Sequence, residues 1–170
     1  YKIWGLIPAG FHLMNILLHL INAILLYRVG LLLFNNYECS SMKSTKQRGI
    51  TALIERFSDG QLISLIAASI FAVHPIHNEP VGRVASGEVI FGFFIILTLY
   101  LFLKDRKHLS LITFALALLS KESAVMLPFG LTFLSTHKDG IKRGLISIIP
   151  YALIVGLYFI IRALVVGVFF

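Results

Sequence analysis

The sequence is 170 residues long, 58% hydrophobic and only 14% charged. Because a soluble domain is about a quarter charged, this composition excludes an ordinary soluble domain and indicates that lipid surrounds the chain. The net charge of +7 comes from short basic clusters between apolar stretches, which favours membrane topology over nucleic-acid binding. Cys39 is the single cysteine, so no internal disulfide can form. Both ends of the sequence interrupt apolar patterns, and we expect the chain to be a fragment of a larger membrane protein.

The apolar stretches predict the membrane helices in chain order. A crossing helix needs about twenty apolar residues, and the uncharged runs near this length predict spans over 11–34, 60–77 and 79–103. A polar, basic loop over 35–60 separates the first two spans. The third span is long enough only if its helix begins near Asn78, which is a good N-cap residue.

The C-terminal half contains two shorter apolar pieces, split by Lys121 and Glu122. One helix over 109–136 would measure about 42 Å, too long for one crossing, whereas two helices would measure about 18–21 Å each. We interpret this segment as a re-entrant-like hairpin whose turn lies below the membrane surface. A single crossing would instead place the basic cluster at 137–143 on the wrong side of the membrane. A last span begins at Gly144.

Most of the fifteen Lys and Arg lie in three stretches between the predicted spans. These stretches are the loop over 28–60 and the short segments 104–108 and 137–143. By the positive-inside rule, the face that receives them is cytoplasmic. The sequence therefore predicts an all-α, polytopic membrane helical bundle of about six membrane helices or half-helices.

Polar residues that are unusual in such a chain gather at the opposite, non-cytoplasmic face. They come from separate segments: His12 and Asn15, the histidine loop over 74–88, the pair Lys121 and Glu122, and Arg162. Ionisable groups near membrane depth are costly and are usually functional. The convergence of these segments indicates a binding site.

A polar stripe is formed by His12, Asn15, His19 and Asn22, which fall within an arc of about 80° on one helix. The stripe has two interpretations. It can supply interhelical hydrogen bonds, which are common in membrane bundles. It can also line a cavity, and the sequence leaves both interpretations open.

The histidine loop opens with HPIHNEP, in which His74, His77 and Glu79 are possible metal ligands. Pro75 breaks the helical geometry between the two histidines, so we predict no tightly bound structural zinc. The sequence specifies no cofactor and leaves a divalent cation open. We favour binding of a polar, anionic substrate.

The alternative for the same loop is a capping role, in which Pro75 closes one helix and Asn78 opens the next. Glu79 and Arg83 are four residues apart in the favourable order, so they can also form a local ion pair.

Lys121 and Glu122 are adjacent, so on a helix they cannot face each other and each needs another partner. A lysine at the floor of a cavity is a suitable point charge for phosphate. Arg162 interrupts the apolar run LYFIIRALVVG. It either snorkels to the interface or binds the phosphate of a lipid ligand through its planar set of donors.

Four blocks of the sequence resemble the transmembrane and tetratricopeptide-repeat O-mannosyltransferases and their bacterial relatives, which are GT-C glycosyltransferases. The blocks are GFHLMNILLHLINAILLY, AVHPIHNEPV, LLSKESAVMLP and LYFIIRALVVG, in this order. The resemblance implies a multi-pass enzyme of the bacterial inner membrane or the endoplasmic reticulum membrane. Such an enzyme transfers a sugar from a polyprenyl-phosphate donor, mannose from dolichyl phosphate in eukaryotic members, to a protein or glycan acceptor. Transfer occurs at the luminal or periplasmic face.

The resemblance also assigns residues to family motifs, namely His74, His77, Glu79, Lys121 and Glu122. In the family, the histidine motif usually continues into an Arg and, two residues later, an Asp. This chain has Gly87 and Val89 at those positions, and Arg83 and Glu88 are the nearby residues that can compensate.

In GT-C enzymes the catalytic acid lies in the first luminal loop, which we expect upstream of Tyr1. No residue of this chain is therefore predicted to be catalytic, and the fragment alone is expected to be inactive. The tetratricopeptide repeats of the family would follow the chain. The implied partners are membrane lipid, the lipid-phosphate sugar donor and the acceptor, with no nucleic acid.

The donor supplies its own anionic leaving group, so cations can replace a general acid. We predict that the donor phosphate contacts Lys121 and Arg162, with Arg83 as a further candidate. His74 and His77 are predicted to hydrogen-bond phosphate or sugar hydroxyls, with Glu79 orienting one of them; His12 and Asn15 complete the predicted substrate-binding residues. Two other classes remain open: a transporter or flippase for a lipid-linked or anionic solute, and an inactive membrane scaffold.

Overall fold

The computed structural model describes residues 8–41, 59–82 and 87–166. In chain order these form α1 (Pro8–Ser41), α3 (Asp59–Val73), η1 (Pro75–His77), α4 (Asn78–Gly82), α5 (Glu88–Leu103), α6 (Lys107–Ser120), η2 (Glu122–Met126), α7 (Leu127–Asp139) and α8 (Ile141–Val166), where η marks a 3₁₀ helix. These described segments contain helices and no strands. The prediction of an all-α fold is confirmed.

Two of the described helices are long and apolar enough to cross a membrane, through Ala9–Phe34 of α1 and Gly144–Val165 of α8. A third candidate is the pair Gly60–Val73 and Pro75–Gly82, which is bent by 46° at the break between them. α5 and α6 are shorter apolar helices. The chain is therefore an integral membrane protein built from helices.

Two predicted boundaries are wrong. α1 continues through Ser41, into the stretch predicted as a loop over 35–60; no Pro or Gly interrupts residues 35–41, so the helix has no local reason to stop. The helix that begins at Asn78 is only the five-residue α4, and the long α5 begins at Glu88. Gly87, in a turn, separates the two helices, and glycine is a residue type that disfavours helix. A single helix over 79–103 does not form.

The two apolar pieces on either side of Lys121 form separate helices, α6 and α7, with η2 between them. Lys121 itself is extended, at φ −156° and ψ 134°, and it ends α6. The placement of this turn below the membrane surface stays a prediction, as does the orientation of the chain in the membrane.

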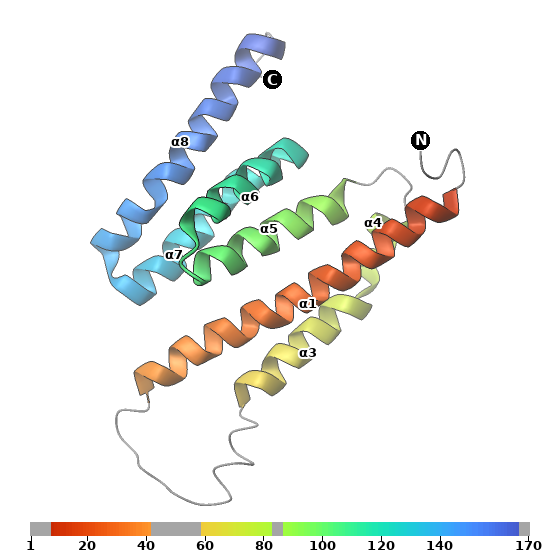
Figure 1. Ribbon diagram of the computed structural model, residues 1–170, viewed down its shortest axis with the longest axis horizontal. Helices are drawn as coiled ribbons and strands as arrows, with labels where there is room; N and C mark the ends of the chain where they lie inside the picture. Colours follow the sequence, from red (N-terminus) through yellow and green to blue (C-terminus); the bar gives the residue numbers. More distant parts are fainter. Residues whose placement is uncertain (1–7, 42–58, 83–86, 167–170) are drawn as a thin grey trace, which may run out of the picture. The chain divides into compact units, whose positions relative to one another are not determined.

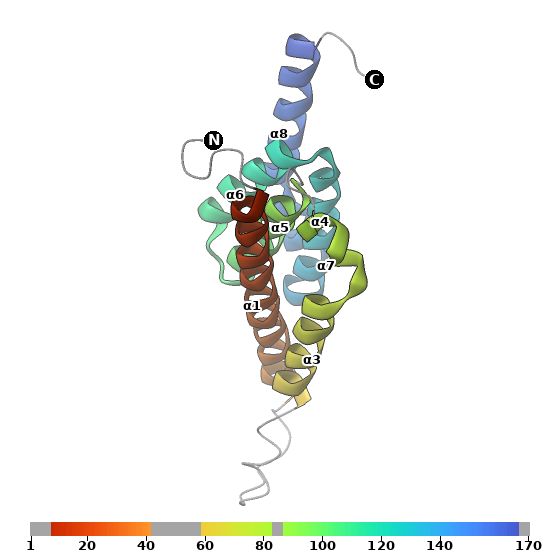
Figure 2. The same ribbon diagram turned by 90° about the vertical axis from the view of Figure 1, so that its right-hand side faces the viewer.

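The chain divides into two compact units, and the boundary lies within α5, between Ile96 and Leu97. In the first unit, α1 and α3 lie side by side (Figures 1 and 2). Their contact depends on small residues, because a Cβ atom added at Gly30 would lie 2.5 Å from Ser64 Oγ. On α3, Gly60, Ser64 and Ala68 recur at every fourth position and are buried. Such spacing lets two helices approach closely, so that dispersion contacts hold them together in lipid.

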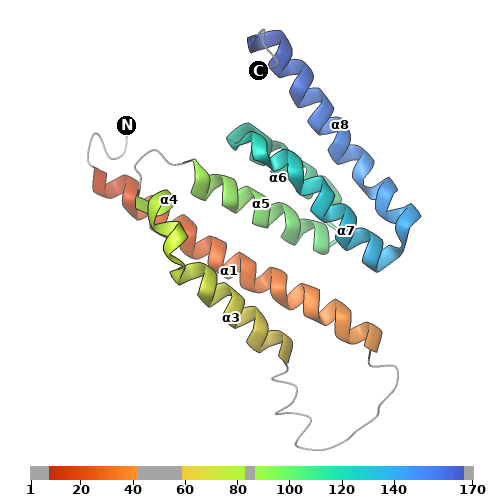
Figure 3. The same cartoon turned by 180° about the vertical axis from the view of Figure 1, so that it is seen from behind.

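In the second unit, α7 and α8 form an antiparallel hairpin (Figure 3). Gly140 makes the turn with a positive φ of 85°, which favours glycine. A Cβ atom at Gly144 would lie 2.5 Å from Thr136 Oγ1, so the two helices are also in close contact after the turn. α6 packs against α8 through Phe114 and Tyr151, both buried, with ring centroids 5.4 Å apart.

Candidate functional site

The polar stripe of α1 bonds to main-chain carbonyl oxygens of the segments beside it. Asn15 Nδ2 donates to the Val81 carbonyl at 3.3 Å, and Asn22 Nδ2 donates to the Val89 carbonyl at 3.1 Å. Both asparagines are buried. These bonds tie α1 to α4 and α5 within the first unit, and Figure 3 shows α4 against the N-terminal half of α1. They support the hydrogen-bonding interpretation of the stripe.

His19, the third polar position of the stripe, connects it to the histidine loop. Its Nε2 lies 3.1 Å from the Ala72 carbonyl, near the end of α3. Its ring centroid is 5.0 Å from that of His77 and 5.2 Å from that of Phe71. We did not predict His19 as a substrate-binding residue, although helical periodicity places it on the same face as Asn15. His12, at the start of the stripe, is half-buried.

The histidine loop is largely helical, with η1 and α4 following α3. α3 ends at Val73, before Pro75. His74 caps η1, because its Nδ1 accepts a hydrogen bond from the Ile76 backbone N–H at 3.2 Å. The predicted capping residues were Pro75 and Asn78, so the cap formed by His74 is one that the sequence analysis did not predict. His77 is half-buried, and its ring centroid lies 4.4 Å from that of Phe71.

The histidine loop offers few further ligands. Glu79 is exposed on α4, and Glu88 is exposed at the start of α5. Arg83 lies outside the described residues. Within the described segments, no group of three or more His, Cys, Asp and Glu side chains has an arrangement that could hold a metal ion. The absence of a structural zinc stays a prediction.

The second unit brings Glu122 and Arg162 together in an ion pair between Glu122 Oε1 and Arg162 Nη1. Arg162 Nη1 also donates to the Tyr158 hydroxyl at 3.3 Å. The adjacent charges of Lys121 and Glu122 do not lie on one α-helix, as we had assumed, because Lys121 is extended and Glu122 begins η2. Glu122 nevertheless finds its partner on another helix.

The hairpin geometry explains why Glu122 meets Arg162. From the turn at Gly140, α7 and η2 rise about 30 Å back to Glu122. Along α8, Arg162 lies about 31 Å from Ile141. Glu122 and Arg162, although far apart in sequence, therefore lie at about the same distance from the turn along the hairpin. They meet at the end of the span opposite to the turn.

Sequence reasoning missed a buried polar network in the second unit. The Tyr151 hydroxyl donates to Ser110 Oγ at 2.8 Å, and Ser110 Oγ donates to the Thr98 carbonyl at 3.0 Å. Thr98 Oγ1 donates to Thr113 Oγ1 at 2.9 Å. The network joins α5, α6 and α8. Isolated Ser, Thr and Tyr residues in apolar helices were its only signal in the sequence.

The position where the resembled mannosyltransferases usually have Asp is occupied by Val89 in this chain. Val89 is buried, and its carbonyl accepts from Asn22. Gly87, at the position of the usual Arg, is exposed in a turn. His19, His74 and His77 belong to the first unit, and the Glu122–Arg162 pair belongs to the second. Their common role in one substrate site stays a prediction.

The comparison with known protein families identifies the family to which this chain belongs. The model of the family described as GPI transamidase subunit PIG-U matches residues 4–169. This chain belongs to the PIG-U family. The match supports the resemblance to GT-C glycosyltransferases that the four sequence blocks carry.

Individual relatives of this PIG-U family chain are O-mannosyl-transferases by name. The chain is 35% identical over 99 residues to human protein O-mannosyl-transferase TMTC4, covering 58% of this chain and 12% of the relative. It is 33% identical over 91 residues to Drosophila melanogaster protein O-mannosyl-transferase Tmtc3, covering 53% of this chain and 9% of the relative. It is 28% identical over 131 residues to Caenorhabditis elegans protein O-mannosyl-transferase F38B6.6, covering 74% of this chain and 16% of the relative. The chain therefore spans only a small part of each relative, and no solved structure matches it.

Proposed function

We propose that this chain forms part of a membrane glycosyltransferase. The enzyme takes a mannose-like sugar from a polyprenyl-phosphate donor, such as dolichyl phosphate, and transfers it to a protein or glycan acceptor on the non-cytoplasmic face. The observation that carries the proposal is the ion pair between Arg162, in an apolar span, and Glu122, next to Lys121. The names of the relatives support the class of reaction.

The electrostatics of this region suit an anionic lipid headgroup. Arg162 lies near the end of the span Gly144–Val165, where a lipid phosphate lies, and a charge within a span is usually functional. The guanidinium carries five N–H donors, so contacts made through Nη1 do not exhaust them. Glu122 holds the guanidinium in place, and Lys121 adds a second positive charge to the same turn. Both Glu122 and Lys121 are exposed, so a ligand can reach them.

In the proposed reaction, the cationic side chains of Lys121 and Arg162 interact with the leaving group, which is the lipid phosphate. In the transfer, the bond between the anomeric carbon and the phosphate oxygen breaks, and its electron pair stays on that oxygen. The acceptor oxygen forms the new bond to the anomeric carbon, and its proton passes to a general base. Lys121 and Arg162 stabilise the negative charge that develops on the phosphate. His74 and His77 bind hydroxyls of the sugar or oxygens of the phosphate.

Lys121→Met in the intact protein tests the proposal, because methionine keeps much of the side-chain bulk and removes the charge. Turnover of dolichyl-phosphate mannose at sub-saturating concentration should fall about ten- to a hundredfold, since a charge-assisted phosphate contact is lost. Lys104→Met, the same change at the other end of the second unit, should leave turnover within about twofold, because an exposed charge far from the donor contributes little. Equal turnover in wild type and Lys121→Met would remove the phosphate role.

A second candidate function is non-catalytic recognition of a lipid-linked glycan. The buried Val89, in place of the usual Asp, favours it, as does the family description as a GPI transamidase subunit. The same variants distinguish the two functions. A protein that binds dolichyl-phosphate mannose, binds it more weakly in Lys121→Met and never transfers the sugar has the recognition function alone.

A further inference from the structure

The guanidinium of Arg162 contacts two protein side chains, and both contacts are made by the same nitrogen. Nη1 forms the ion pair with Glu122 Oε1 and also donates to the Tyr158 hydroxyl at 3.3 Å. Since Nη1 carries two N–H groups, these contacts use both of them. Glu122 balances the charge of Arg162. Tyr158 carries no charge, so its contact contributes geometry rather than charge.

Tyr158 meets Arg162 because both lie on one face of α8. They are four residues apart, and a helical side chain leans toward the N-terminus of its helix, so Arg162 reaches back over the turn that carries Tyr158. The Tyr158 ring is half-buried and lies edge-on against Phe159, with ring centroids 5.7 Å apart. A tyrosine side chain has few torsions, whereas an arginine side chain is long and flexible. The Tyr158 hydroxyl is therefore a fixed point beside a flexible cation.

The apolar surroundings make the partner of each N–H group important. Tyr158 lies within the span Gly144–Val165, where most of the large apolar side chains are exposed. In such a medium a donor that loses its partner gains little from water and turns toward another acceptor. Glu122 is already paired with Arg162, and a carboxylate often binds a guanidinium through two parallel hydrogen bonds. Without the Tyr158 hydroxyl, such a pair would occupy a whole edge of the guanidinium.

The N–H groups on Nε and Nη2 form an edge of the guanidinium that differs from the two contacts of Nη1. Two parallel donors on one edge match two oxygens of a phosphate. The Arg162 side chain is 34% exposed, so a lipid headgroup can reach it. We infer that Tyr158 is a positioning residue, whose hydroxyl holds Nη1 so that the Nε–Nη2 edge of Arg162 faces the donor phosphate. The inference rests on the proposed function, in which Arg162 binds that phosphate.

The orientation of Arg162 matters most in the transition state. Negative charge grows on the phosphate as its oxygen leaves the anomeric carbon, and an edge that is already oriented stabilises this charge better than a guanidinium that rotates. Tyr158 itself neither gains nor loses a proton in the transfer. Loss of its hydroxyl should therefore lower kcat more than it raises KM.

A double-mutant cycle of Tyr158→Phe and Arg162→Lys in the intact protein tests the inference, with dolichyl-phosphate mannose as the donor. Tyr158→Phe should lower kcat/KM about fivefold, mainly through kcat, because it removes the hydroxyl and keeps the ring. Arg162→Lys keeps the charge and removes the planar edge, so it should lower kcat/KM about tenfold or more. In the Arg162→Lys background, Tyr158→Phe should change kcat/KM by less than about twofold, since no guanidinium is left to orient.

Tyr100→Phe is the matched control, because it removes the hydroxyl of another half-buried tyrosine in the same unit. Its kcat/KM should stay within about twofold of wild type. Unfolding titration in mixed micelles gives the folded fraction of each variant, to which kcat is normalised. If the protein binds the donor without transferring the sugar, the same pattern is expected in the dissociation constant.

Wild-type kcat/KM in Tyr158→Phe would overturn the inference. Additive effects of Tyr158→Phe and Arg162→Lys would also overturn it, because Tyr158 would then anchor the span at the membrane interface, a role that does not depend on Arg162. Both outcomes leave the proposed function intact as long as Arg162→Lys and Lys121→Met lower turnover. Wild-type turnover in those two variants would instead remove the phosphate role of the proposed function, and the inference with it.

Discussion

The two units satisfy their polar groups in different ways. In the first unit, side chains of the stripe bond to main-chain carbonyls, as Asn15 does to Val81 and Asn22 to Val89. In the second unit, side chains bond to main-chain carbonyls as well, as Ser110 does to Thr98, but they also bond to one another, as Tyr151 does to Ser110 and Glu122 to Arg162. Polar residues in apolar helices therefore do not have one meaning, and the partner of each residue decides its role.

Broken helices account for part of this difference. The last carbonyls of a helix have no intrahelical partner, and in lipid no water replaces it. α3 ends at Val73, and His19 of the stripe lies against the Ala72 carbonyl near this end. In the second unit, the network instead joins positions inside α6 and α8, such as Ser110 and Tyr151.

The largest effect that we predict concerns the close contact of the first unit. Gly30→Leu should destabilise the protein by about 3 kcal/mol or more, because its Cβ alone would lie 2.8 Å from the Ser64 Cβ. Gly156→Ala in the second unit is the control, since among the described residues nothing lies within 4 Å of an added Cβ. It should be neutral or stabilise by about 0.5–1 kcal/mol. Unfolding titration in mixed micelles measures both; equal stability of the two variants would show that α1 and α3 do not depend on close packing.

A smaller effect is expected at the network of the second unit. Tyr151→Phe removes the hydroxyl that donates to Ser110 and should destabilise by about 1 kcal/mol, the usual value of an interhelical hydrogen bond in a membrane. Tyr27→Phe, at a half-buried position of α1, should change stability by less than about 0.5 kcal/mol. The same titration checks both variants. A neutral Tyr151→Phe would mean that the network contributes no net stability.

The smallest effect is predicted for Asn22→Leu in the stripe. The substitution loses the bond to the Val89 carbonyl, but it also removes Asn22 Oδ1, which is buried without a partner in the described part of the chain. These changes oppose each other, so stability should change by less than about 1 kcal/mol. Unfolding titration and turnover of dolichyl-phosphate mannose should be measured together. Unchanged stability with reduced turnover would favour the cavity-lining interpretation of the stripe over the hydrogen-bonding one.

The sequence alone determined the membrane class, the helical architecture and the breaks at Pro75 and Lys121. These are local properties, because composition sets the solvent that a segment prefers and a proline or a charge interrupts an apolar helix within a few residues. Helical periodicity likewise placed Asn15 and Asn22 on one face. The sequence analysis ended the first helix at Phe34, whereas α1 continues to Ser41. Helix extension past Phe34 depends on helix propensities, which differ little between residues.

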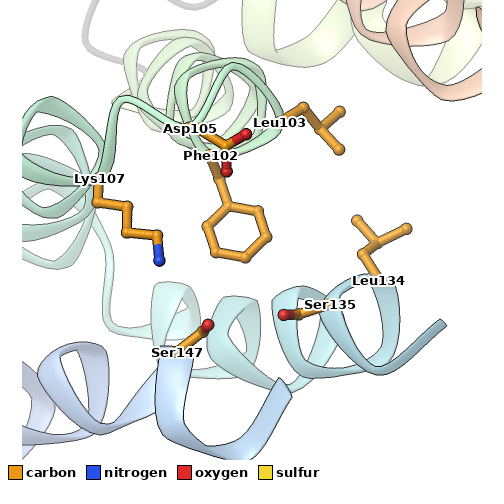
Figure 4. Close-up of a pocket in the computed structure, with 7 residues that line it drawn as sticks. All are labelled: Phe102, Leu103, Asp105, Lys107, Leu134, Ser135 and Ser147. Carbon is orange, nitrogen blue, oxygen red and sulfur yellow. The ribbon is translucent and has the colours of Figure 1, made fainter. Parts of the chain in front are cut away.

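Only the tertiary structure decided which polar groups meet. Glu122 and Arg162 are 40 residues apart, and their contact follows from the length of the α7–α8 hairpin. His19 meets His77 because α1 and α3 pack along small residues. Ser135 lines a small pocket where four helix ends converge within one unit (Figure 4). Such contacts cannot be read from local pattern, since side chains take their partners from segments that packing brings close and sequence spacing does not specify.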